Sequence, residues 1–374
     1  MPKTLRVILP LLLLALPTAA QEDFCGVCKN EGYVPCEDKK CRKVVCPTTI
    51  DHLCTRRLRL PCCHGLGKVP CKFCDHNHAK FAFGIEMDGR KKWLEDMKAL
   101  ETRFRIKKME HIQTDHFNLH YDIPKIKVGM KTYDMFKGAH LYAERLEDLY
   151  AEWTKRFDRP YRSPTTGRWD VYMVRDLKER DRVTQTIIGG NATKLFGTTT
   201  SIYVVAAGKR VIRKDEERHA NVYHHVSHLI TQQGHPIGKF EYPGWWSAGI
   251  AHWLEENEFG DTRNFCTGEV SSRRDKWQDG GWKGKMFSRV SRKKDISLAT
   301  FAKRDVDKLS PMLQAYSWSF VDFILTEHAD AAAGLERDLT SSGNTEAAFR
   351  KNLGMTVARF QDAWREWVLK AYAR

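Results

Sequence analysis

Beyond its first twenty residues, this sequence has no apolar run long enough to cross a bilayer, which takes about 20 residues. The first twenty residues combine the basic Lys3 and Arg6, an apolar run over 7–16 and small residues over 17–20. This tripartite pattern is typical of a secretory signal peptide, and its apolar run is too short for a membrane span. We therefore expect residues 1–20 to be cleaved, leaving an exported chain, periplasmic or extracellular, with no transmembrane segment.

Acidic residues are scarce relative to basic ones, with 47 Asp and Glu against 62 Lys and Arg, so the net charge is +15. Basic side chains concentrate over residues 263–294, where Trp277 and Trp282 are interleaved with them. Such a stretch suits an acidic polymer or a nucleic acid as a partner, with strongly salt-dependent binding. Because no nucleic-acid motif accompanies the charge, a solvated loop is the simpler interpretation. A polyanion-binding envelope protein is kept as an alternative function.

Cysteine is nearly missing from most of the chain, since ten of the eleven cysteines lie between Cys25 and Cys74 and the other is Cys266. This distribution predicts two parts, because small exported modules rich in cysteine rely on disulfides or metals in place of a large core. We expect a cysteine-rich module over residues 21–78 and a larger domain over residues 90–374.

An internal repeat runs through the cysteine-rich module. Residues 28–36 align without gaps on residues 63–71, each reading Cys, three residues, Gly, one residue and Val-Pro-Cys. One Cys-x-x-Cys pair, Cys25 and Cys28, leads into the first copy, and another, Cys71 and Cys74, follows the second. This spacing lets two thiolates converge on one metal, the glycines let the backbone bend around it, and four sulfurs complete a tetrahedral zinc site. The candidate zinc ligands of the module are Cys25, Cys28, Cys36, Cys41, Cys63, Cys71 and Cys74.

These Cys-x-x-Cys and Cys-x-Gly-x-Gly elements resemble the cysteine-rich zinc module of DnaJ-type chaperones, over this module alone. The match is imperfect, because Leu60 stands where a second cysteine is expected and Cys62 is shifted beside Cys63. A disulfide framework is the competing hypothesis, and Cys46 and Cys54 have no place in the repeat. Ten cysteines suit two four-sulfur zinc sites plus one disulfide, or five disulfides. The paired knuckles favour zinc, and either arrangement implies a structural role or a binding surface.

The larger domain combines amphipathic helices with alternating strands. Strands come first and helices follow, which predicts an α+β fold class. The helices are expected over 91–112, 135–157, 216–232, 246–256, 313–327 and 357–372, and the strands over 116–122, 169–174 and 201–205.

A pair of histidines carries the main chemical signal of this domain. His224 and His228 are four residues apart on a predicted helix, so their side chains lie one turn apart on the same face. That spacing lets two imidazoles bind one zinc ion, as in His-Glu-x-x-His metallopeptidases. The pair alone is a weak signal, but the segment that follows it reads Pro243-Gly-Trp-Trp-Ser-Ala-Gly249.

This segment resembles the Pro-x-Trp-x-Ser-Glu-Gly segment of gluzincin-type (peptidase-MA-like) zinc peptidases, and similar pieces recur in order over residues 111–372. The resemblance implies a zincin-like fold in which His224 and His228 are zinc ligands. It also implies a general base at position 225 and a third zinc ligand at position 248, both of which are glutamates in that family. Here His225 and Ala248 occupy those two positions.

The loss of both carboxylates decides the expected function. A catalytic zinc normally has three protein ligands and one open position for water, and loss of a general base costs roughly 10²- to 10⁴-fold in rate. We therefore assign no catalytic residue and expect no tightly held zinc in the larger domain. His252, one turn beyond Ala248 on the same helix face, is the candidate substitute ligand.

The leading hypothesis is thus a pseudoenzyme: an exported, catalytically inactive, metallopeptidase-like protein that acts as a binding or scaffold protein for a peptide or protein ligand. Zinc is expected as a cofactor of the cysteine-rich module. The alternative from the enzyme class is a zinc-dependent peptidase or hydrolase with a rebuilt ligand set of His224, His228 and His252.

Overall fold

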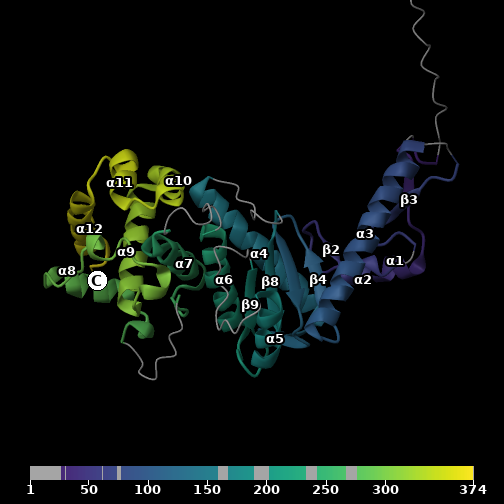
Figure 1. Ribbon diagram of the computed structural model, residues 1–374, viewed down its shortest axis with the longest axis horizontal. Coiled ribbons are helices and arrows are strands. Elements are labelled where there is room, and N and C mark those ends of the chain that lie inside the picture. Colours follow the sequence, from purple (N-terminus) through teal and green to yellow (C-terminus); the bar gives the residue numbers. More distant parts are fainter. Residues whose placement is uncertain are drawn as a thin grey trace, which may run out of the picture.

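A mixed five-stranded sheet stands between helices in this computed structural model (Figure 1). The described residues are 27–29, 31–60, 62–73, 77–158, 167–188, 202–232, 242–266 and 276–373. The strand order is β2 (Leu53–Cys54), β4 (Glu110–Gln113), β5 (Phe117–Tyr121), β8 (Trp169–Val174) and β9 (Ile202–Ala206). The first three strands pair antiparallel, and β5, β8 and β9 pair parallel. Helix and strand are therefore combined in one chain, as the expected class requires, and a cysteine-rich region precedes the sheet.

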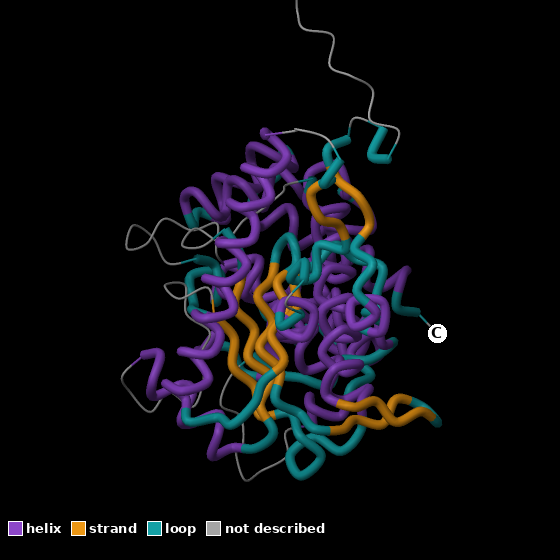
Figure 2. The backbone as a smooth tube through the Cα atoms, turned by 90° about the vertical axis from the view of Figure 1, so that its right-hand side faces the viewer, coloured by secondary structure: helices purple, strands orange, loops and turns teal. Residues whose placement is uncertain are grey.

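The sheet is covered on both faces because its strands alternate apolar side chains with a period of two. Trp169, Val171 and Met173 of β8 face the main core together with α4 (Met135–Phe157). Tyr172 and Val174 point the other way, into a second core formed with α5 (Leu177–Ile188) and with the end of α3 (Asn77–Phe104). Parallel strands need long crossovers, and α4 and α5 (Leu177–Ile188) supply them. Figure 2 shows the resulting layers of helices around the strands.

A group of helices follows the sheet and packs beside it. The helices α6 (Asp215–Gln232), α7 (Gly244–Phe259) and α9 (Pro311–Glu327) pack against one another. Helix α7 is buried along most of its length, as expected of a helix that is apolar on all sides. The remaining α-helices here are α8 (Trp282–Ser291), α10 (Ala332–Ser342), α11 (Thr345–Leu353) and α12 (Val357–Ala371), with short 3-10 turns at Lys276–Asp279, Leu298–Thr300, Val306–Lys308 and Ala329–Ala331.

The cysteine-rich region is built on its sequence repeat. The strands β1 (Tyr33–Pro35) and β3 (Lys68–Pro70) pair antiparallel with Val34 opposite Val69, the same position of each copy. The backbone N–H of Cys36 donates to Gly67 O at 2.8 Å, and that of Cys71 donates to Gly32 O at 2.9 Å. The two copies of the repeat therefore pair through equivalent positions and are related by a local two-fold axis.

Two short helices and a long one complete this region. The short helices are α1 (Lys39–Lys43) and α2 (Thr55–Leu58), and α3 (Asn77–Phe104) runs from the cysteine-rich region to the sheet across the predicted boundary between residues 78 and 90 (Figure 1). Strand β2 belongs by sequence to the cysteine-rich region but pairs with β4 of the central sheet. A hairpin of β6 (Lys125–Val128) and β7 (Lys131–Asp134) lies apart from that sheet.

The segments expected over 135–157 and 169–174 are found as α4 and β8. The helix expected over 91–112 is wrong at its end, because α3 ends at Phe104 and residues 110–113 form β4. Arg105 adopts a left-handed φ of 53°, and the N–H of Ile106 donates to Glu101 O, which closes the helix. The predicted signal peptide lies outside the described residues. Within the described ranges, no helix has both the length and the apolar character that a membrane span requires.

Candidate metal centre

Three histidines surround one cysteine between α6 and α7. His224 and His228 lie one turn apart on α6, His252 lies on α7, and Cys266 follows α7 in a loop. Each of the four side chains is at most 2% exposed. The Sγ atom of Cys266 lies 3.1 Å from Nε2 of His228 and 3.6 Å from Nε2 of both His224 and His252. The packing of the two helices thus converts an i, i+4 pair into a four-residue cluster.

The 3.6 Å distances from Cys266 Sγ to His224 and His252 match the edges of a tetrahedral metal site, and the 3.1 Å distance to His228 is a thiol–imidazole contact. With metal–sulfur and metal–nitrogen bonds of about 2.3 and 2.0–2.1 Å, sulfur and nitrogen ligands are about 3.6 Å apart. The ligand atoms of His224, His252 and Cys266 all lie within 4.8 Å of one another. His228 is outside this set of three, so a cation held here would be bound by the sulfur of Cys266 and by nitrogens of His224 and His252.

The carboxylate of Glu255 lies beside this cluster. Its Oε2 atom lies 3.0 Å from Nδ1 of His224 without the alignment of a hydrogen bond, and both side chains are fully buried. A small rotation of either side chain would let Nδ1–H donate to the carboxylate, which is the contact that leaves Nε2 of a ligand histidine free for a metal. The other oxygen, Oε1, accepts from the backbone N–H groups of Arg263 and Asn264 at 2.8 and 3.2 Å, which ties down the loop that leads to Cys266.

Gln314 of α9 fixes the far side of the cluster. Its Oε1 atom accepts from the backbone N–H of Cys266 at 3.2 Å and lies 3.0 Å from Nε2 of His252. An amide oxygen only accepts, so Nε2 of His252 carries a hydrogen in this contact and must give it up to bind a metal. On His228, Nδ1 contacts Ser247 Oγ at 2.7 Å, and Nε2 faces Cys266.

Burial sets the charge state of these groups. Desolvation lowers the pKa of His224 and of His228 well below the usual range, and the neighbouring imidazoles lower both further. Desolvation likewise lowers the pKa of His252. Neutral imidazole is the form that binds metals. Desolvation also raises the pKa of Glu255 to about 7, against the opposing effect of His252.

The two positions where the family has glutamates are placed differently from the histidine cluster. His225 is half-buried, and its ring lies 5.5 Å from that of Tyr203 on β9. Ala248 is fully buried in the core and has no ligand atom on its side chain. His252 does reach the cluster, as the substitute ligand would have to. Cys266 was not among the candidate ligands, and its sole sequence signal is its isolation from the other cysteines.

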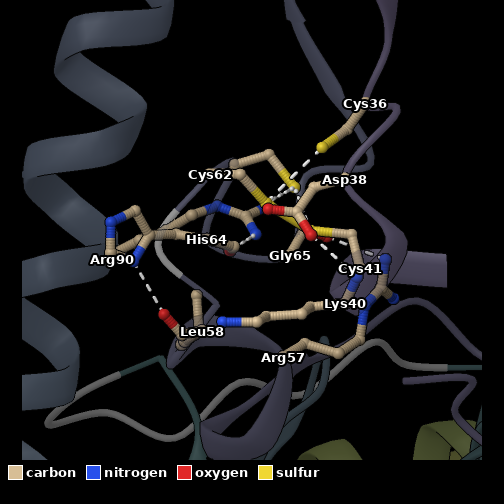
Figure 3. The surroundings of a disulfide bond; sticks show 11 residues. Cys36, Asp38, Lys40, Cys41, Arg57, Leu58, Cys62, His64, Gly65 and Arg90 are labelled. Carbon is tan, nitrogen blue, oxygen red and sulfur yellow. Dashed lines mark hydrogen bonds between the residues drawn. A yellow bond between two sulfur atoms is a disulfide. The ribbon is translucent and has the colours of Figure 1, made fainter. Parts of the chain in front are cut away.

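A second cluster lies in the cysteine-rich region, where the sulfurs of Cys36, Cys41, Cys62 and Cys63 come within 4.8 Å of one another. Cys41 and Cys62 form a disulfide, shown in Figure 3. The Sγ atoms of Cys36 and Cys62 are 3.5 Å apart, as are those of Cys41 and Cys63. With the Cys41–Cys62 disulfide reduced, such a cluster could hold a metal ion, and zinc in this region stays a prediction. Cys62, which the repeat alignment left aside, is part of the cluster.

The other predicted ligands of this region are less fully described. Cys28 and Cys71 are buried in contact with each other, from opposite copies of the repeat. Cys25 and Cys74, their Cys-x-x-Cys partners, lie outside the described residues. Cys28 and Cys71 are thus the part of a second candidate site that the structure describes.

The basic stretch of residues 263–294 is described except for 267–275. Its later part lines a surface pocket with Trp277, Lys285 and Arg289. Some of these cations already have protein partners: Nζ of Lys285 donates to Gly280 O at 2.6 Å, and Nε of Arg289 donates to Tyr316 Oη at 2.8 Å. An acidic polymer as partner stays a prediction.

Comparison with known proteins adds no further constraint. No protein-family model matches this chain, and a search of curated proteins finds no significant match. The chemistry of the sites is therefore argued from their geometry alone.

Proposed function

We propose that this chain is an exported, non-catalytic protein of zincin-like type whose former peptidase centre is a buried structural metal site, and that it serves as a binding or scaffold protein. The observation that carries the proposal is the position of Cys266, with Sγ at 3.1–3.6 Å from three imidazole nitrogens. Zinc suits this nitrogen and sulfur donor set. The ligand atoms of His224, His252 and Cys266 lie within 4.8 Å of one another, and a closed, structural site would need His228, whose Nε2 lies 3.1 Å from Cys266 Sγ, as the fourth ligand.

Three features argue against hydrolysis at this centre. The Sγ atom of Cys266 lies among the imidazole nitrogens, so a thiolate would occupy a position that a three-histidine catalytic zinc leaves to water. The cluster is almost fully buried, so a peptide has no direct access to it. Glu255, the carboxylate that faces His224, also holds the Arg263 and Asn264 backbone and sits behind the imidazole, away from the metal position. Its geometry is that of an orienting residue, not of a base that activates water.

The alternative function, a zinc hydrolase using His224, His228 and His252, differs from this proposal in one ligand. Three histidines with an open fourth position make a catalytic zinc site. The two proposals therefore make opposite predictions about activity while sharing the metal.

The first test combines metal analysis with a peptide-hydrolysis assay on the secreted full-length protein. We expect the wild type to hold one more equivalent of zinc than His224→Ala and to show no turnover of a peptide library with added zinc. His225→Ala, altered at the next residue of the same helix, is the matched control and should keep the metal.

Hydrolysis that His224→Ala abolishes and His225→Ala retains would overturn the proposal in favour of the hydrolase. An equal zinc content in the wild type, His224→Ala and His225→Ala would show that this centre binds no metal. Because His224 is fully buried, Cys266→Ala is measured alongside it, so that a folding defect of one variant cannot decide the outcome.

A further inference from the structure

A third group of metal-binding side chains lies where the cysteine-rich region meets α4. It consists of Cys46 in the segment after α1, His52 just before β2, Cys54 at the end of β2 and His140 on α4. One ligand atom from each residue lies within 4.8 Å of all the others. Cys46 and Cys54 are the two module cysteines outside the repeat, and neither histidine belongs to a sequence motif.

The distances within this group match a tetrahedral site with two sulfur and two nitrogen ligands. The Sγ atoms of Cys46 and Cys54 are 3.6 Å apart, and the Nε2 atoms of His52 and His140 are 3.2 Å apart. In a tetrahedral zinc site, two sulfurs are about 3.8 Å apart and two nitrogens about 3.3 Å, given the bond lengths of zinc to each.

The hydrogen bonds of the two rings turn two nitrogen acceptors toward each other. Nδ1 of His52 lies 2.7 Å from Ile50 O, and Nδ1 of His140 lies 2.8 Å from Phe136 O. A carbonyl oxygen only accepts, so both Nδ1 atoms carry a hydrogen. When both imidazoles are neutral, both Nε2 atoms are bare lone pairs 3.2 Å apart. Their repulsion is removed by a proton on one ring or by a metal ion bound to both, and the two adjacent cysteine sulfurs suit the metal ion.

The same backbone contacts are the arrangement that metal-binding histidines usually have. A ligand histidine donates its other ring N–H to a carbonyl or carboxylate, which fixes the ring and its tautomer. Both rings meet this condition. Two thiolates would also neutralise the charge of a divalent cation, which a site this sheltered requires because burying an uncompensated charge is costly. Cys54 and His140 are each 1% exposed, and the half-buried Cys46 leaves a path for a metal to enter.

We propose that Cys46, His52, Cys54 and His140 form a zinc site that clamps the cysteine-rich region to α4 of the larger domain. The clamp joins residues 88 positions apart in the sequence. It acts beside the pairing of β2 with β4 and beside Arg56, whose guanidinium lies 3.0 Å from Glu110 and 3.8 Å from the ring of Phe136. The site is separate from the centre of His224 and Cys266, so each proposal can fail without the other.

The experiment measures zinc by mass spectrometry in the secreted full-length protein after dialysis against metal-free buffer. We expect Cys46→Ser and His140→Ala each to hold one equivalent less than the wild type. The control His78→Ala alters an exposed histidine of α3 and should hold the wild-type amount. Cys46→Ser changes one atom of a half-buried side chain, so it decides the outcome if His140→Ala does not fold.

A disulfide between Cys46 and Cys54 is the competing state, and thiol alkylation of the denatured, unreduced protein detects it. Labelling of both cysteines after zinc removal supports the site. A Cys46–Cys54 linked peptide, or unchanged zinc in Cys46→Ser, overturns it. His224→Ala and Cys266→Ala are expected to remove the zinc ion of the other centre. Their zinc contents therefore do not affect the test of the site formed by Cys46, His52, Cys54 and His140.

Discussion

At the residue scale, a single cysteine separates a closed metal site from an open one. Three histidine ligands would by themselves leave a fourth position for water, and Sγ of Cys266 lies within 4.8 Å of the ligand atoms of His224 and His252, close enough to share a metal with them. In this proposal, the residue that decides whether the centre is catalytic is therefore Cys266. It lies outside both sequence motifs and is neither His225 nor Ala248. Its place depends on the Gln314 and Glu255 hydrogen bonds that hold its loop.

Replacing that cysteine tests its role directly. We expect Cys266→Ser to bind zinc at this centre at least about tenfold more weakly, about 1.4 kcal/mol, because a thiolate ligand is exchanged for a hydroxyl. The measurement is competition with a chromogenic zinc chelator, in which one equivalent should leave at a correspondingly lower chelator concentration. His225→Ala again serves as the control, and identical release curves for Cys266→Ser and wild type would show that the sulfur is not a ligand.

At the element scale, the close approach of α7 to α9 sets the position of the centre. Gly249 of α7 faces α9 so closely that a Cβ atom there would lie 2.5 Å from Ser317 O and 2.5 Å from Val321 Cγ2. The following turn of α7 carries His252 and Glu255, and α9 supplies Gln314. Any separation of these helices moves ligands from both sides of the site.

This approach predicts that Gly249→Ala destabilises the protein. Overpacking of a tight interface typically costs about 1–3 kcal/mol, and the metal of the His224 centre should be held less well. Thermal unfolding should show a lower midpoint. The control is Gly84→Ala in α3, where a Cβ meets nothing within 4 Å and the exchange should be neutral or stabilising by up to about 1 kcal/mol. Equal midpoints for wild type and Gly249→Ala would contradict the proposed interface.

At the scale of the whole molecule, buried histidines outside the metal clusters also limit stability in acid. His111 on β4 is almost fully buried and contacts Nδ1 of His120 at 2.7 Å. Desolvation lowers the pKa of His111 to about 4, although Glu101 opposes the shift. The usual pKa of an exposed histidine is about 6.5.

Because the folded-state pKa is depressed, the stability associated with His111 is complete above about pH 6.5 and is lost as the pH falls toward 4. The loss amounts to roughly 3 kcal/mol across this window, at about 1.4 kcal/mol per pKa unit. Urea unfolding at several pH values should therefore give a shallower dependence for His111→Gln than for wild type. The exposed His78→Gln serves as the control. Parallel curves for wild type and His111→Gln would show that this histidine does not contribute.

The cysteine-rich region and the larger domain are also less separate than their compositions suggest. Strand β2 extends the central sheet, α3 runs from one part to the other, and His140 of α4 meets Cys46, His52 and Cys54. A ligand-binding or scaffold role would therefore involve both parts, with two metal sites holding helices of the larger domain in place.

The sequence by itself determined what depends on near neighbours. Periodicity predicted α4 and β8, and the i, i+4 spacing placed His224 and His228 on one face. The tertiary structure decided which distant side chains meet, because burial of α7 between α6 and α9 and pairing of β2 with β4 act over long separations. Cys266 lies 42 residues from His224, and His52 lies 88 residues from His140. No local pattern records such distances, so both complete ligand sets appear only once the helices and strands are packed.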